Sequence, residues 1–167
     1  RWNGALGWLQ GAVWDARLES CRRLIGASCR GREGYAPLNA VTELSTTVPG
    51  ANRALVVATG YNDWSGWFPL GVAAMLEQAR AKGIDRVIWL TYRENVGYVS
   101  PSGASNAASF AVNNAHLRSL VASGRYPELI LADWDGYSRS HPSWVTSDGV
   151  HLTATGAPQA AAYVSRK

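Results

Sequence analysis

The sequence predicts one α/β domain over residues 1–167, a three-layer α/β/α sandwich around a flavodoxin-like, mostly parallel sheet. Three observations lead to this fold class. Short and almost continuously apolar runs recur along the chain, helix-like stretches alternate with them, and polar residues follow directly after the runs. The length favours a single domain with a sizeable core. Alternating strands and helices are typical of a parallel sheet that is covered on both faces.

The expected strands are the apolar runs. Three of them are strong, at residues 54–59, 86–91 and 129–133, and a weaker one covers residues 11–16. Each strong run is short and nearly free of polar residues, as expected for a parallel strand buried on both faces. Their carboxyl ends should therefore share one rim of the sheet, where ligands bind in folds of this kind.

The expected helices lie between these runs. Residues 69–82 carry leucine and alanine at helical spacing, and Gly83 suits the end of a helix. Residues 105–123 and 155–164 form two further helices, residues 37–47 are a weaker candidate, and residues 2–9 are expected to be the end of another helix. The segment 98–109 is rich in glycine, serine and alanine and is expected to be a loop that enters a helix.

Charge and composition argue against two partner classes. The formal net charge is +4, from 16 basic and 12 acidic residues, and most of the basic residues are scattered. The chain has neither zinc-ligand spacing nor an RNA-binding aromatic motif, so we expect no nucleic-acid partner and no metal. No apolar run is long enough to span a bilayer, so we expect no membrane span in this segment.

Two cysteines, Cys21 and Cys29, flank a short loop that contains arginine and glycine. We predict a disulfide between them, because little else in the segment holds it; the alternative is two buried thiols. A bridge across a loop of this size contributes roughly 2.5 kcal/mol in the chain-entropy treatment. A disulfide indicates a secreted or extracytoplasmic protein.

An aspartate and a histidine near the end of the chain form the main candidate site. Asp148 stands three residues before His151, in a loop ahead of the last helix. A carboxylate at this spacing can bond one imidazole nitrogen, fix the tautomer and leave the other nitrogen to accept a proton. The alternative is that Asp148 only accepts backbone N–H groups at the start of a helix.

The rim after the first strong strand supplies a second candidate group. In the stretch 60–63, a glycine permits a tight turn and Asn62 can donate its amide N–H to a developing oxyanion. The alternative is a turn in which Asn62 bonds only local backbone. Four aromatic or basic residues near the rim are further candidates for substrate contact: Tyr61, Trp64, Trp144 and Arg93. The alternatives are core packing of the aromatic residues and a surface ion pair between Arg93 and Glu94.

Two motifs resemble the SGNH (GDSL-type) hydrolases. The stretch Gly60-Tyr61-Asn62-Asp63 resembles the third sequence block of that family, and Asp148-Gly149-Val150-His151 resembles the fifth. The chain is similar to the secreted actinobacterial branch, which includes small esterases and domains appended to membrane acyltransferases. The resemblance implies that His151 is the base, Asp148 its partner and Asn62 an oxyanion-hole donor, with no cofactor.

The family's nucleophile block is missing. No Gly-Asp-Ser occurs, and the strand that should precede it, at the centre of a flavodoxin-like sheet, is also absent. We therefore expect an N-terminally incomplete domain, with the first strand and the serine upstream of residue 1 in a larger parent chain. The alternatives are a pseudoenzyme or recruitment of Ser20. The second block's backbone oxyanion donor is expected near residues 20–22.

The expected function is a serine ester hydrolase for small acyl esters, which include O-acetylated carbohydrate. An acyltransferase would use the same residues. The alternative class is a non-catalytic module that binds glycans through its tryptophan-rich crevice, since eight tryptophans is a high number for a chain of this length.

Overall fold

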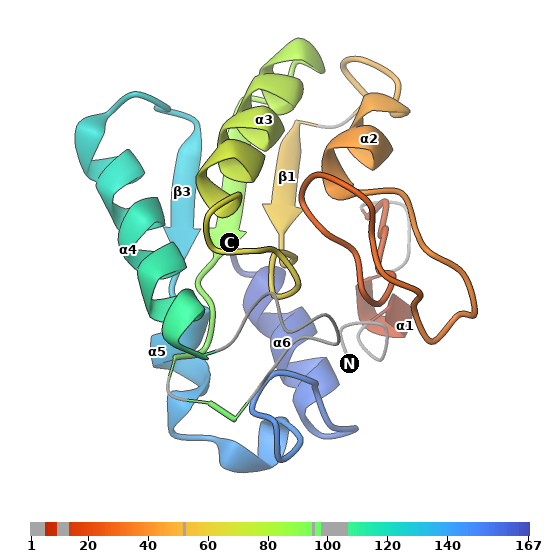
Figure 1. Ribbon diagram of the computed structural model, residues 1–167, viewed down its shortest axis with the longest axis vertical. Helices are drawn as coiled ribbons and strands as arrows, with labels where there is room; N and C mark the ends of the chain where they lie inside the picture. The colour runs from red at the N-terminus through yellow and green to blue at the C-terminus, as the bar shows by residue number, and fades with distance from the viewer. Residues whose placement is uncertain (1–5, 10–13, 52, 95, 98–106) are drawn as a thin grey trace.

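A computed structural model describes residues 6–9, 14–51, 53–94, 96–97 and 107–167. The fold is α/β, with a three-stranded parallel sheet and helices on both of its faces (Figure 1). The elements, in chain order, are α1 (Leu6–Leu9), α2 (Ala40–Ser45), β1 (Ala54–Val57), α3 (Phe68–Ala81), β2 (Arg86–Leu90), α4 (Ala107–Ser123), β3 (Leu129–Ala132), α5 (Trp134–Arg139), the 3₁₀ turn η2 (Pro142–Trp144) and α6 (Gly156–Val164).

The strands lie in the order β1-β2-β3, and both pairs are parallel. Side chains alternate between two apolar cores, as the pleat requires. Val87 and Trp89 belong to the core that includes α2, α3 and α4, whereas Ile88 and Leu90 belong to the core that includes α6. Both faces of β2 are therefore buried, which explains why its sequence is a continuous apolar run.

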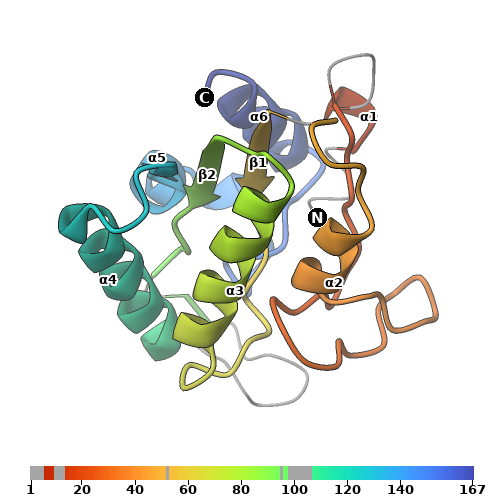
Figure 2. The same ribbon diagram turned by 90° about the horizontal axis from the view of Figure 1, so that it is seen from above.

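Two helical layers enclose the sheet. Helices α2, α3 and α4 lie on one side, and α1, α5 and α6 lie on the other (Figure 2). Helix α1 contacts α6, and α2 contacts α3. This arrangement confirms the predicted α/β class with a parallel sheet and is compatible with the predicted sandwich. The carboxyl ends of all three strands lie on one rim.

Local sequence signals explain the ends of two helices. The Asn39 side chain accepts a hydrogen bond from the Thr42 N–H at 2.9 Å and caps the start of α2. Pro69 stands in the first turn of α3, where a missing N–H costs nothing, and Gly83 follows the helix with a φ of +73°. The predicted helix over 37–47 is shorter in the structure, where α2 covers Ala40–Ser45.

Two other expectations need correction. Of the weak strand predicted at 11–16, residues 11–13 lie outside the described residues, and Asp15 and Ala16 are not part of a strand. A strand requires a ladder to a neighbour, and among the described residues of this segment only Trp14 takes part in a bridge, a single one outside the three-stranded sheet. Helix α5 was not among the expected elements. Its signal in the sequence is Asp133, whose carboxylate accepts the Gly136 N–H at 3.1 Å and caps the start of the helix.

The predicted disulfide is present. Cys21 and Cys29 are bonded, with their Cα atoms 5.3 Å apart. The bridge closes a loop that begins at Cys21, whose φ of +66° places it in the left-handed region. None of the helices in the described part of the chain is long and apolar enough to cross a bilayer.

Candidate functional site

The Asp148–His151 loop lies between η2 and α6. The His151 Nδ1 atom is 2.6 Å from Asp148 Oδ2, so the carboxylate holds the imidazole. The other carboxylate oxygen, Oδ1, accepts the N–H groups of Val150 at 2.8 Å and His151 at 3.0 Å and the Thr146 hydroxyl at 2.8 Å. One carboxylate oxygen of Asp148 therefore caps the loop, and the other contacts the imidazole ring, so Asp148 does more than accept backbone N–H groups.

Asp148 remains ionised over the range in which a histidine titrates. Burial raises the pKa of Asp148, but hydrogen bonds from the His151 ring, the Val150 and His151 N–H groups and the Thr146 hydroxyl outweigh burial and lower the pKa to about 2. A fixed negative charge beside Nδ1 keeps the proton on that nitrogen and stabilises an imidazolium when Nε2 accepts a second proton.

The backbone of this loop is constrained on both sides. Val145 and Leu152 form an antiparallel bridge, and the Thr146 N–H donates to the His151 carbonyl at 2.7 Å. Gly149 has a φ of +78°, and a Cβ at that position would lie 2.5 Å from a methyl carbon of Val96. The glycine in the Asp-Gly-Val-His stretch is thus required by both its backbone angle and its neighbour.

The turn after β1 places Asn62 at the same rim. Gly60 has a φ of +117°, and a Cβ there would overlap the Tyr92 hydroxyl, which donates to the Thr59 carbonyl at 2.7 Å. This turn therefore also depends on glycine. The chain leaves the strand sharply, and Asn62 reaches the cavity that His151 lines.

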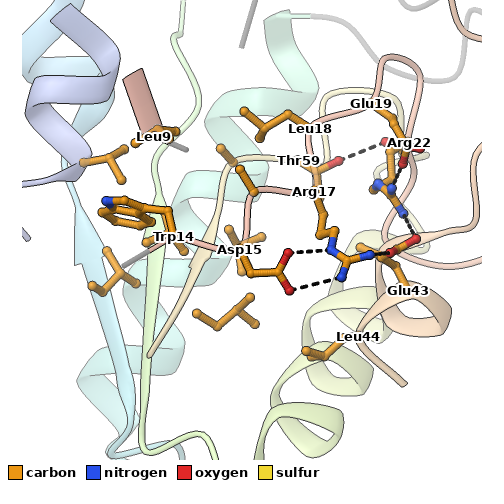
Figure 3. Close-up of a pocket in the computed structure, with 18 of the residues that line it drawn as sticks. Leu9, Trp14, Asp15, Arg17, Leu18, Glu19, Arg22, Glu43, Leu44 and Thr59 are labelled. Carbon is orange, nitrogen blue, oxygen red and sulfur yellow. Dashed lines mark hydrogen bonds and ion pairs between the residues drawn. The ribbon is translucent and has the colours of Figure 1, made fainter. Parts of the chain in front are cut away.

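That cavity lies beside β1 and reaches the carboxyl rim. Its volume is about 610 Å³, and it extends along the outer edge of β1 (Figure 3). One wall comprises residues 54–59 and the facing wall residues 14–22; Tyr61, Asn62, Val150 and His151 lie at the carboxyl end. We call this cavity the β1 pocket. It is the feature that brings together Asn62 and His151, two residues far apart in the sequence.

The remaining predicted contact residues separate into buried and exposed groups. Tyr61 packs edge-on against Tyr92, with ring centroids 4.8 Å apart, and it lines the β1 pocket from within the core. Arg93 is buried at 7% exposure, although its side chain was expected to reach substrate. Glu94 accepts a hydrogen bond from Asn114 at 2.8 Å and lies 3.6 Å from Arg118, which takes the place of the ion pair considered with Arg93.

Two tryptophans of the prediction lie away from the β1 pocket in the described structure. Trp64 is 59% exposed and lies beside Trp67, with ring centroids 6.2 Å apart. Trp144 is half-buried and stacks on His141 at 3.9 Å. Neither ring is among the described residues that line the β1 pocket.

Ser20 is held by other groups. Its hydroxyl donates to Glu33 at 2.6 Å and accepts the Arg32 N–H at 2.7 Å. These bonds fix the hydroxyl within its own loop, which argues against the recruitment of Ser20 as a nucleophile.

No family model and no curated protein matches this chain. Among the described residues, no cluster of three or more histidine, cysteine or acidic side chains could hold a metal ion. The site is therefore interpreted from its own geometry.

Asp63 is a residue that the sequence analysis did not assign. Its carboxylate is 2% exposed, and both oxygens lie 3.0 Å from the Leu24 N–H, so it pins the disulfide loop to the end of β1. Burial raises the pKa of Asp63 to about 6, against the lowering effect of the hydrogen bonds from the Leu24 and Ile25 backbone. The sequence signal was its place in the turn after a strand, directly after Asn62.

The raised pKa of Asp63 predicts a pH-dependent stability. Between pH 4 and 6 the Asp63 carboxyl keeps a proton in the folded state that it has lost in the unfolded state. The stabilisation that protonated Asp63 gives to the folded state is therefore fully present below pH 4 and is lost as the pH rises through about 6. Asp63→Asn should reduce the stability difference between pH 4 and pH 7 by about 3 kcal/mol. Urea unfolding at the two pH values measures this.

The matched control for this experiment is Asp85→Asn, at an exposed carboxylate paired with Arg53. We expect it to leave the pH dependence as in the wild type. An Asp63→Asn protein with the same pH dependence as the wild type would contradict the role given to burial.

Proposed function

We propose that this chain belongs to a serine ester hydrolase of the SGNH type. Support comes chiefly from one observation, the 2.6 Å bond between Asp148 and His151 at the carboxyl rim of a parallel sheet, with Asn62 at the same pocket. In this role His151 is the general base, Asp148 orients it, and Asn62 donates to the oxyanion. The nucleophile is a serine from the polypeptide ahead of residue 1.

The reaction proceeds in two balanced steps. The serine Oγ bonds to the ester carbonyl carbon while its proton passes to Nε2 of His151. The carbonyl oxygen becomes an oxyanion, to which Asn62 donates. When the C–O bond to the alcohol breaks, His151 returns the proton to the leaving oxygen. Water then attacks the acyl-serine by the same route and releases the acid and the serine; an alcohol acceptor in place of water gives acyl transfer.

Small acyl esters, including O-acetyl groups on carbohydrate, are the proposed substrates. The exposed pair Trp64 and Trp67 begins two residues after Asn62 and can stack on a sugar ring without entering the core. The disulfide fits a secreted or extracytoplasmic enzyme. The same pair supports the second candidate function, a glycan-binding module without catalysis.

Asn62→Ala tests the oxyanion role. In the parent polypeptide, kcat for p-nitrophenyl acetate should fall by roughly 10² to 10³ with little change in KM, because the lost bond forms only in the transition state. Initial rates measured up to saturating ester concentrations give kcat and KM separately. A loss confined to KM would show that Asn62 binds substrate and would contradict the oxyanion role.

The two candidate functions give different outcomes with one reagent. A fluorophosphonate probe should label one serine of the parent polypeptide covalently, and mass spectrometry of the labelled peptide identifies it. Binding of acetylated glycans by a protein that neither reacts with the probe nor hydrolyses the ester would support the binding module and would contradict the enzyme.

A further inference from the structure

Arg93 is a buried cation that has no anionic partner among the described residues. The residue is 7% exposed, and its Nη1 atom is enclosed without a hydrogen-bond partner there. No carboxylate in the described part of the chain forms an ion pair with its guanidinium. Burying a charge without a partner opposes folding, so this cation is expected to meet an anion that the described residues do not supply.

The acidic side chains closest to Arg93 along the rim are engaged with other cations. Glu94, the next residue, lies 3.6 Å from Arg118. Asp135 accepts the Glu94 N–H at 3.1 Å and forms an ion pair with Arg139. These carboxylates are therefore matched elsewhere, and they do not compensate the charge of Arg93.

The two neighbours of Arg93 in the sequence indicate where its side chain points. The chain continues from β2 to Glu94 without a turn. The Tyr92 ring stacks on Phe110 of α4, with centroids 5.9 Å apart. The Glu94 carboxylate accepts a hydrogen bond from Asn114 of the same helix at 2.8 Å. Because alternate residues of an extended segment point to opposite sides, Arg93 points away from α4.

On the side away from α4, the chain that follows Arg93 meets the Asp148–His151 loop. The ends of that loop bridge to each other and pack on the core that includes α6. Val96 contacts the loop directly, since a Cβ on Gly149 would lie 2.5 Å from a methyl carbon of Val96. The segment that begins at Arg93 therefore borders the loop that carries the proposed general base.

The turn after β1 borders Arg93 from another direction. The Arg93 N–H donates to the Tyr61 hydroxyl at 3.4 Å, and Tyr61 lines the β1 pocket with Asn62 and His151. Arg93 therefore stands between the segments that carry the proposed oxyanion donor and the proposed base. It is not itself among the described residues that line the β1 pocket, so a group that it binds lies outside that cavity.

We propose that Arg93 binds a carboxylate of the substrate, so that the ester is carried by an acidic sugar of the uronate type. This inference rests on the proposed function and adds a charge to its substrate. The sequence pointed to Arg93 only as a substrate contact, and the missing counter-charge indicates the kind of group that it contacts. The planar guanidinium forms two parallel hydrogen bonds with a carboxylate. A single cation matches one negative charge, whereas a phosphate monoester carries roughly two at pH 7.

Equilibrium binding to the parent polypeptide, followed by NMR titration, tests the inference without catalysis. The Kd for methyl glucuronoside should be about 10- to 100-fold lower than that for methyl glucoside, which has the same ring and no charge. Arg93→Met should abolish this difference, and its melting temperature should equal or exceed that of the wild type, because the variant loses an unpaired buried charge. The matched control is Arg118→Met, which removes the same charge from an exposed position on α4 and should keep the preference for the acid.

Four results would overturn the inference. These are equal Kd values for the acidic and the neutral sugar, a preference that survives in Arg93→Met or is lost equally in Arg118→Met, tighter binding of glucose 6-phosphate than of the glucuronoside, and a lower melting temperature of Arg93→Met, which would indicate a structural partner for Arg93.

The inference and the enzymatic proposal fail separately. Acid-selective binding by a protein that hydrolyses no ester would remove the proposed function and leave the carboxylate site in place. An active esterase that binds the two sugars equally would remove the carboxylate site alone.

Discussion

Replacing His151 with alanine in the parent polypeptide is expected to lower kcat for p-nitrophenyl acetate by about 10⁴ to 10⁶. The ring is the proposed acceptor of the serine proton, and its loss also removes the partner of Asp148. The labelling rate of the serine by a fluorophosphonate should fall with kcat, because both need a deprotonated hydroxyl.

The matched control is His141→Ala. His141 stacks on Trp144 and is not among the described residues that line the β1 pocket, so its loss should leave kcat near the wild-type value. We expect both variants to give the circular dichroism spectrum of the wild type, which checks that they fold. Equal activity in the wild type and the His151→Ala variant would remove the hydrolase proposal.

The second large effect is expected from Asp148→Asn, with a loss of about 10⁴ in kcat. The variant keeps an oxygen at Oδ1, which can still accept the backbone N–H groups of Val150 and His151. At the other position an amide N–H₂ faces Nδ1 and drives the ring into the wrong tautomer. Activity should therefore fall while the loop and the melting temperature change little.

Two measurements separate this orienting role from a structural one. Imidazole ¹⁵N shifts of His151 should report a change of tautomer in Asp148→Asn, and Asp148→Ala should lose melting temperature as well as activity, because it also removes the cap. Asp85→Asn is the control for a lost surface carboxylate. An unchanged tautomer together with normal kcat would contradict the proposed role of Asp148.

The parts of the fold that were predictable depend on neighbours in sequence. The three strong strands and α3 were predictable from the sequence. Burial on both faces of a strand gives a continuous apolar run, and burial of one face of a helix gives apolar residues at helical spacing. The Asp148–His151 bond was visible for the same reason: three residues separate the groups, and a loop can close that distance. Helix α5 was missed because six residues hold too little of a helical period.

The parts that were not predictable depend on distant contacts. Tyr61 was expected to contact substrate; it lines the β1 pocket, and its partly buried ring also packs against Tyr92 and Phe110, with centroids 4.8 and 5.0 Å away. Asp63 lies 39 residues from Leu24, the group it binds. A polar residue after a strand has the same appearance in the sequence whether it faces solvent or is enclosed by another segment.

The sequence by itself determined the alternation of strands and helices, the disulfide and the pairing of Asp148 with His151. Each depends on periodicity or on a spacing of a few residues, which local physics decides. Only the tertiary structure decided that Asn62 and His151 line one pocket, that Arg93 is buried, and that the outer edge of β1 faces a cavity. These depend on which segments pack side by side, and the free energy of that choice is distributed over the whole core.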